Sequence, residues 1–112
     1  MMDIVFANDR LHKLCNSASK LNGEYGPRMA KVIRRRLADL EAADSLEVMR
    51  LLPGRCHELI ANYSGHLALD LEHPDRLIFK PANEPLPVDS SGRLDWSKVT
   101  KVMIVDIGNY HK

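Results

Sequence analysis

Apolar residues recur at steps of three and four positions over residues 27–43, and this spacing places them on one face of an α-helix. Proline is well tolerated at the first position of a helix, where its missing N–H would have no partner, and Pro27 suits that position. We therefore predict the main amphipathic helix over residues 27–43, with its arginines on the outer face. The apolar positions are Met29, Val32, Ile33, Leu37 and Leu40.

A short strand and a first helix are predicted before this segment. Residues 4–6 favour a strand, and the side chain of Asn8 can cap a helix that begins near Asp9. Leu11 and Leu14 would lie on the inner face of that helix. The residues predicted to interrupt the helical hairpin are Asn22, Gly23 and Gly26.

After Gly54 the spacing of apolar residues changes from that of helices to that of strands. One further helical turn is predicted from Ser45, and Pro53-Gly54 would stop it. Alternating apolar and polar residues then predict a meander of strands. The last strand has apolar residues on both faces, which favours an interior position in the sheet. The predicted strands span residues 55–60, 66–71, 76–80 and 99–106.

The alternation also assigns side chains to the two faces of this sheet. The leucines of the 66–71 segment would face the helices, whereas Ala68 and Asp70 would face away from them. In the following strand, Arg76 and Lys80 would share one outward face. Positively charged side chains are therefore expected on the sheet face that the helices leave uncovered.

The segment 81–98 has three prolines and one glycine, so it cannot be a regular strand throughout. A structureless loop of this length is unusual in a small domain and is often functional or mobile. We expect Trp96, near the end of the segment, to anchor the loop onto the sheet rather than to stack on a nucleotide.

Composition narrows the class of protein. A chain of 112 residues with 45% hydrophobic content fits one domain with a single modest core. The two cysteines are too few for a disulfide scaffold, and no leader pattern is evident, so we expect a reduced, cytoplasmic protein. No apolar run approaches the roughly 20 residues of a membrane span, so no membrane contact is expected.

Five stretches, in order along the chain, resemble one family. Together they are similar to the RelE/ParE superfamily of bacterial toxins, close to its host-inhibition-of-growth (HigB-like) or plasmid maintenance killer branch. The combination of LPGRCHEL, RLIF and a terminal YH is the most specific part of this resemblance. The stretches are LHKLCNS at 11–17, RRRLADLEAADSLEVMRLLPGRCHEL at 34–59, RLIFKPANEPLP at 76–87, LDWSKVTKV at 94–102 and VDIGNYH at 105–111.

The resemblance implies an α+β fold, in which an N-terminal strand and a helical hairpin pack on a twisted, mainly antiparallel sheet of four to five strands. Residues 1–112 would form a single toxin domain. The resemblance also implies cleavage of messenger RNA on the ribosome and a helix-turn-helix antitoxin as partner. The basic cluster at residues 34–36 could then contact ribosomal RNA, dock an acidic antitoxin or form a solvated helix face.

Cleavage of RNA without a metal or cofactor needs a base, a cation and an acid. The base deprotonates the 2′-hydroxyl for attack on the adjacent phosphate, the cation stabilises the added charge, and the acid protonates the leaving 5′-oxygen. By its position in RLIF, Arg76 matches the phosphate-stabilising arginine of the family. His111 is the candidate acid or base, because histidine titrates near neutral pH. Tyr110 could stack on a base or hold the phosphate.

Three further residues are candidates for RNA binding at the same groove, namely Lys80, Arg55 and His57. A metal site at His57 and the adjacent Cys56 is not predicted, because the pair lacks further ligands at a suitable spacing. No cofactor is expected.

Asp70 departs from the family pattern, since catalytic members often carry a second basic residue on the strand before RLIF. A carboxylate there would repel a phosphate, and Arg76 could instead form a salt bridge with Asp70 across adjacent strands. Residues at a chain end are also often frayed, so Tyr110 and His111 could have no role.

Two other functions therefore stay open. The chain could be a non-catalytic relative that binds its antitoxin and acts only through that complex, for example in operator autoregulation. Inhibition of DNA gyrase, as in the ParE branch, is disfavoured because the terminal Tyr-His pair resembles the nucleases of the superfamily.

Overall fold

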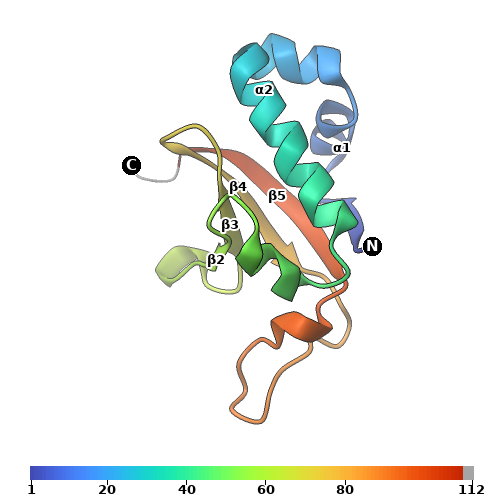
Figure 1. Cartoon of the computed structure of the whole chain (residues 1–112), viewed down its shortest axis with the longest axis vertical. Helices are drawn as coiled ribbons and strands as arrows, with labels where there is room; N and C mark the ends of the chain where they lie inside the picture. Colours follow the sequence, from blue (N-terminus) through green and yellow to red (C-terminus); the bar gives the residue numbers. More distant parts are fainter. Residues whose placement is uncertain (110–112) are drawn as a thin grey trace.

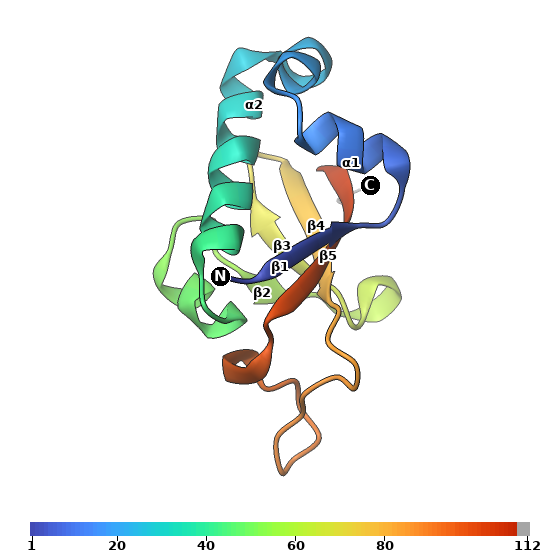
Figure 2. The same ribbon diagram turned by 90° about the vertical axis from the view of Figure 1, so that its right-hand side faces the viewer.

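The computed structural model describes residues 1–109, and these form two layers (Figures 1 and 2). Helices α1 (Asp9–Cys15) and α2 (Ala18–Ala42) cover one face of a five-stranded sheet, which confirms the predicted α+β class. The strands are β1 (Asp3–Phe6), β2 (His57–Glu58), β3 (Leu67–Asp70), β4 (Asp75–Pro81) and β5 (Lys101–Asn109).

Both helices begin at a side-chain cap. Asn8 accepts a hydrogen bond from the Leu11 N–H at 2.9 Å, as predicted, and Ser17 accepts one from the Lys20 N–H at 3.2 Å to start α2. The chain therefore turns between the helices at residues 16–17, earlier than predicted. Within residues 1–109, no helix has the length and apolar character needed to cross a membrane.

The predicted interruption of the hairpin is correct at Gly26 and wrong at Asn22 and Gly23. Gly26 has a φ of +82°, and this non-helical residue breaks α2 immediately before Pro27. Asn22 and Gly23 stay within the helix. Their helix propensity is low, but it costs only about 1 kcal/mol per residue, which packing of the hairpin can override.

The sheet has the strand order β1-β5-β4-β3-β2. β1 runs parallel to β5, and the other neighbouring pairs are antiparallel. β5 is thus an interior strand, as its apolar residues on both faces predicted. The ladder between β4 and β5 shifts between Ile78 and Phe79, so Val105 is passed over in the pairing.

The core lies between the helices and the sheet. It includes Ile33 and Leu40 of α2 and the inward-facing Leu69 and Phe79, all completely buried. Burial of each such side chain contributes about 1.5–3 kcal/mol to folding. Ala68 lies on the opposite face, as the alternation predicted, and it is buried there together with Ile78.

β2 is much shorter than the predicted strand over 55–60. Gly54 and Arg55 have positive φ values of +111° and +50°, which strand pairing does not accommodate. Ala61, with a φ of +58°, bends the chain after the strand. The early turn at Gly54 is also what brings Arg55 toward β3, because Gly54 accepts a hydrogen bond from the Asp70 N–H at 2.7 Å.

The long loop after β4 projects from one end of the molecule (the orange segment in Figures 1 and 2). Trp96 holds its end, as predicted, in the short 3₁₀-helix η3 (Trp96–Lys98). The indole is buried, and its Nε1 donates to Glu58 Oε2 at 2.9 Å. The guanidinium of Arg50, from η1 (Leu46–Leu51), lies 3.7 Å from the ring centroid.

Candidate functional site

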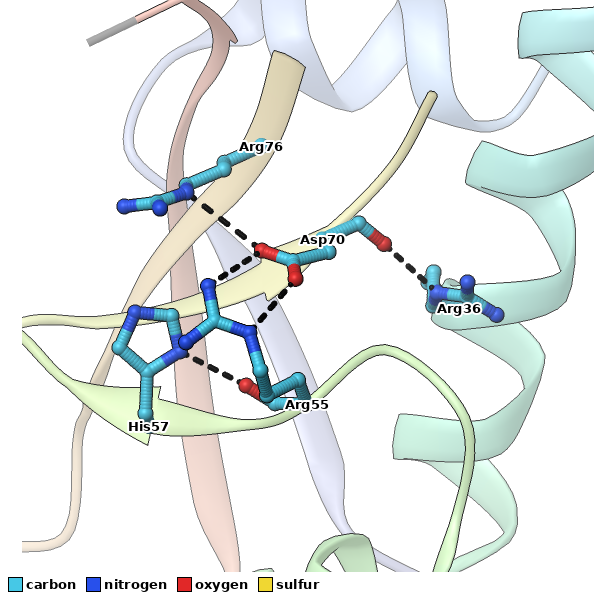
Figure 3. A network of polar contacts seen from close by, with 5 residues as sticks. All are labelled: Arg36, Arg55, His57, Asp70 and Arg76. Atoms are coloured by element: carbon cyan, nitrogen blue, oxygen red, sulfur yellow. Dashed lines mark hydrogen bonds and ion pairs between the residues drawn. The ribbon is translucent and has the colours of Figure 1, made fainter. Parts of the chain in front are cut away.

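Two arginines meet at the carboxylate of Asp70, at the end of β3 (Figure 3). Arg55 Nε lies 2.9 Å from Asp70 Oδ2, and Arg55 Nη2 lies 3.3 Å from Oδ1. Arg76 Nε lies 3.4 Å from the same Oδ1. The salt bridge between Arg76 and Asp70 that the sequence offered as an alternative is therefore present, and Arg55 joins it.

The backbone of Asp70 is held on both sides. Its N–H donates to the Gly54 carbonyl at 2.7 Å, and its carbonyl accepts from Arg36 Nε at 2.9 Å. Asp70 also pairs in register with Arg76 of β4. The backbone of Asp70 is thus fixed. Its side chain is 36% exposed, compared with 61% for Arg55 and 18% for Arg76.

Arg36 is placed differently from the prediction, which assigned the arginines of α2 to its outer face. It contacts β3 instead, because it lies on the same helical stripe as Met29, Ile33 and Leu40, at steps of three and four residues. An arginine can bury its stem there while its guanidinium reaches a polar partner. Its spacing from the apolar residues was the signal that could have identified it. Arg34 and Arg35 are exposed, as predicted.

His57 lies beside Arg55, with its Nδ1 2.7 Å from the Arg55 carbonyl (Figure 3). A carbonyl oxygen can only accept, so Nδ1 carries the proton of this hydrogen bond. In the neutral ring, the lone pair is then on Nε2. His57 is opposite Ala68, two residues from Asp70 along β3, which places it about 7 Å from Asp70 along the strand.

A cavity of about 310 Å³ adjoins this cluster. It lies at the turn between β3 and β4, and both arginines line it. On the other side of β4, Arg76 is opposite Gly108, and Asp75 is opposite Asn109. The last described residues of β5 therefore lie next to Arg76. The residues that line the cavity are Arg55, Asp70, Leu71, His73, Pro74, Asp75 and Arg76.

Tyr110 and His111, the predicted catalytic residues of the chain end, lie outside the described residues. Their predicted roles stay predictions. The strand that leads to them ends at Asn109, opposite Asp75 and one position from the pair formed by Arg76 and Gly108.

Lys80 is on the same face of β4 as Arg76 but at the other end of the strand, about 13 Å away along it. It lines a different cavity, of about 430 Å³, together with Lys101 and Met103. The structure therefore brings Arg55, His57 and Arg76 together and leaves Lys80 apart from them.

Cys56 precedes His57, but its chemistry differs from that of a metal ligand. Burial raises the pKa of the Cys56 thiol to about 12, so it stays protonated at neutral pH. The thiolate is the form that binds metals and acts as a nucleophile. Among residues 1–109, no three or more His, Cys, Asp or Glu side chains form a group that could hold a metal ion.

No protein-family model and no curated protein matches this chain. Several solved structures do match it. The YoeB/ParE toxin from Agrobacterium tumefaciens matches with a TM-score of 0.61 and 8% identity over 98% of this chain and 100% of that one. The YoeB-YefM complex from Staphylococcus aureus matches with a TM-score of 0.55 and 19% identity over 100% of this chain and 99% of that one. The YoeB dimer from Staphylococcus aureus matches with a TM-score of 0.56 and 19% identity, over 99% of this chain and 98% of that one.

Each of these matches covers at least 98% of both chains, and together they establish the fold. The chain has the RelE/ParE-like fold, a helical hairpin on a five-stranded mixed sheet, as the sequence resemblance predicted. The structures that share it are toxins of the YoeB/ParE type.

Proposed function

We propose that this chain is the toxin of a type II toxin-antitoxin system, and that it inhibits translation by cleaving messenger RNA on the ribosome. The fold that it shares with YoeB/ParE toxins supports the first part. The second part rests on one observation. Two guanidinium groups and an imidazole converge on the sheet face away from the helices, at the end of β5 that leads to Tyr110 and His111.

In the proposed reaction, Arg76 binds a non-bridging oxygen of the scissile phosphate, and its planar guanidinium suits that geometry. Arg55 adds a second positive charge next to that of Arg76, so the phosphate meets two guanidinium groups instead of one. A base takes the 2′-hydroxyl proton, the 2′-oxygen bonds to phosphorus, and the bond from phosphorus to the 5′-oxygen breaks. An acid then gives a proton to the 5′-oxygen, so no metal or cofactor takes part.

His111 is proposed as the acid or base, and Tyr110 as the residue that stacks on a base or holds the phosphate. His57, on β2 beside Arg55, and Lys80, at the end of β4 away from Arg76, are proposed as further contacts for RNA. We assign the chain to the HigB-like branch because of the LPGRCHEL, RLIF and YH stretches. Its partners would be a helix-turn-helix antitoxin, the ribosome and messenger RNA, and it would act in the cytoplasm.

The ion pairs of Asp70 favour a second candidate function. Both arginines already have a carboxylate partner, which reduces the positive charge available to an RNA phosphate. A chain of this kind could keep the fold and the antitoxin contact without cleaving RNA. A stable complex with a helix-turn-helix antitoxin, together with intact messages on purified ribosomes, would support this second function over the first.

Induced expression in bacteria without an antitoxin tests the proposal. Wild-type chain should arrest growth and produce cuts in ribosome-bound messages, mapped by primer extension. Arg76→Ala should lose about 10²- to 10³-fold in cleavage rate, the usual effect of removing one transition-state stabiliser. Arg93→Ala is the matched control, because Arg93 lies in the distal loop, and it should cut messages like wild type.

Intact growth and intact messages on expression of the wild-type chain, with Arg76→Ala behaving the same, would overturn the nuclease proposal. A supercoiling assay separates the gyrase alternative, since inhibition of supercoiling by the wild-type chain would assign it to that function instead.

A further inference from the structure

The cluster at Asp70 has the geometry of an occupied anion site. Arg55 contacts both oxygens of one carboxylate, and Arg76 contacts one of the same two oxygens. Side-on pairing of a guanidinium with two oxygens is also how arginine binds phosphate. We propose that the Asp70 carboxylate occupies the position of a phosphate in a two-arginine site, and that an incoming phosphate of RNA displaces it.

The backbone determines which partner would move. Asp70 is held by Gly54 through its N–H and by Arg36 through its carbonyl, both in hydrogen bonds shorter than 3 Å, at 2.7 and 2.9 Å. The Asp70 backbone therefore stays in place. The Arg55 side chain, 61% exposed, is the most exposed of the three, and the Arg76 side chain is 18% exposed. A ligand would therefore draw the guanidinium groups away from Asp70 and into the adjoining cavity.

The charges make this exchange feasible. The three side chains together carry one net positive charge, since one carboxylate faces two guanidinium groups. Partly exposed ion pairs of this kind contribute little to stability, so a competing anion can replace them. Asp75 adds a second carboxylate at the cavity, and His73 lines it as well. Asp70 would thus weaken binding of RNA without preventing it, and this inference deepens the nuclease function proposed above.

Binding measurements test this directly. We would titrate purified chain with inorganic phosphate and, separately, with a short 2′-O-methyl RNA that cannot be cleaved. Asp70→Asn should bind the RNA roughly three- to tenfold more tightly than wild type, because one repulsive charge is removed at close range. The double variant with Arg76→Gln should lose this gain. Tighter binding of the RNA alone would identify the RNA backbone as the ligand, and tighter binding of both would identify a general phosphate site.

Asp75→Asn is the matched control, since it removes the same charge from the same cavity but no ion pair with Arg55 or Arg76. Asp75→Asn should change the affinity for the RNA by less than half as much as Asp70→Asn does. Equal effects of the two variants would reduce the role of Asp70 to overall charge and would overturn the proposal. Weaker binding by Asp70→Asn would overturn it too, because Asp70 would then be positioning the arginines for the ligand.

The wild-type chain offers a test that no folding defect can obscure. Addition of the 2′-O-methyl RNA should shift the side-chain Nε–H signals of Arg55 and Arg76 together in nitrogen-15 spectra. The Arg36 Nε–H signal should stay in place, because its partner is a backbone carbonyl. Unchanged signals of Arg55 and Arg76 would contradict the proposal. These binding experiments need no ribosome, so they can fail while messages are still cleaved, and they can succeed if cleavage is absent.

Discussion

Gly54 helps to fix the position of Asp70, because its carbonyl accepts a hydrogen bond from the Asp70 N–H. It has a φ of +111°, in the region that side chains disfavour. A Cβ there would lie 2.8 Å from Arg36 Nε and 3.1 Å from Leu69 Cδ2. The absence of a side chain therefore lets Arg36 pass close to the chain and reach the Asp70 carbonyl.

Replacement of this glycine should be costly. Gly54→Ala should lower the free energy of unfolding by about 2–4 kcal/mol, from the strained φ and the displaced Arg36, measured by urea denaturation. Gly23→Ala is the matched control, because no atom lies within 4 Å of its added Cβ inside α2. It should raise stability by about 0.5–1 kcal/mol. Equal effects of the two substitutions would contradict this account of Gly54.

At the same scale, the sequence predicted some contacts of the cluster and missed others. The pairing of Arg76 with Asp70 follows from the register of neighbouring strands, so it could be stated as an alternative. The approach of Arg55 to Asp70 depends on positive φ values at residues 54–55, which a strand pattern does not reveal. The hydrogen bond of Arg36 runs against the prediction, because a charged side chain ordinarily indicates the outer face of a helix.

Among the elements, η3 illustrates how a long loop is attached by one buried side chain. Trp96 packs under Arg50 and donates a hydrogen bond to Glu58 of β2. Three separate parts of the chain therefore meet at this indole. The prolines and glycine of segment 81–98 predicted a loop, and the apolar size of Trp96 predicted its anchor. The partners of the indole could not be predicted, because they depend on the position of β2.

A single substitution should measure this attachment. Trp96→Phe keeps an apolar ring under Arg50 but removes the hydrogen bond to a carboxylate, so it should cost about 1–3 kcal/mol of unfolding free energy. Glu58→Gln keeps an acceptor oxygen and should cost less. Guanidinium denaturation of both variants tests this ordering. A stability of Trp96→Phe equal to that of wild type would show that packing alone holds the loop.

At the scale of the whole molecule, the sequence predicted the fold class and most of the strands. The strands could be predicted because alternation of apolar and polar residues is a local signal. The helical hairpin and the interior position of β5 are both confirmed. The choice of β1 as the neighbour of β5 could not be predicted from alternation. Strand β1 is short, and nearly the whole chain separates it from β5. Its pairing therefore depends on the three-dimensional arrangement of the helices between them.

Stability of the whole molecule should fall at alkaline pH. Burial raises the pKa of Cys15 to about 11 and those of Cys56 and Tyr25 to about 12, above their values in an unfolded chain. The folded state then keeps protons that the unfolded state loses, so the stabilisation is complete below about pH 8.5 and declines as the pH rises toward 11.

Melting temperatures measured between pH 8 and pH 10.5 should show this decline. Cys56→Ala removes one of the three groups, so its melting temperature should fall less steeply over the same interval. An identical slope for wild type and this variant would show that Cys56 makes no contribution.

The pairing of β1 with β5 has a consequence for the synthesis of the protein. Asp3 pairs with Lys101, so β1 cannot complete its pairing until β5, nearly a hundred residues later, has been synthesised. Contacts so distant in sequence form late in folding. A nascent chain that is still incomplete has neither a closed core nor the strand that passes beside Arg76. The proposed toxin activity therefore requires β5 to have been synthesised and paired with both β1 and β4.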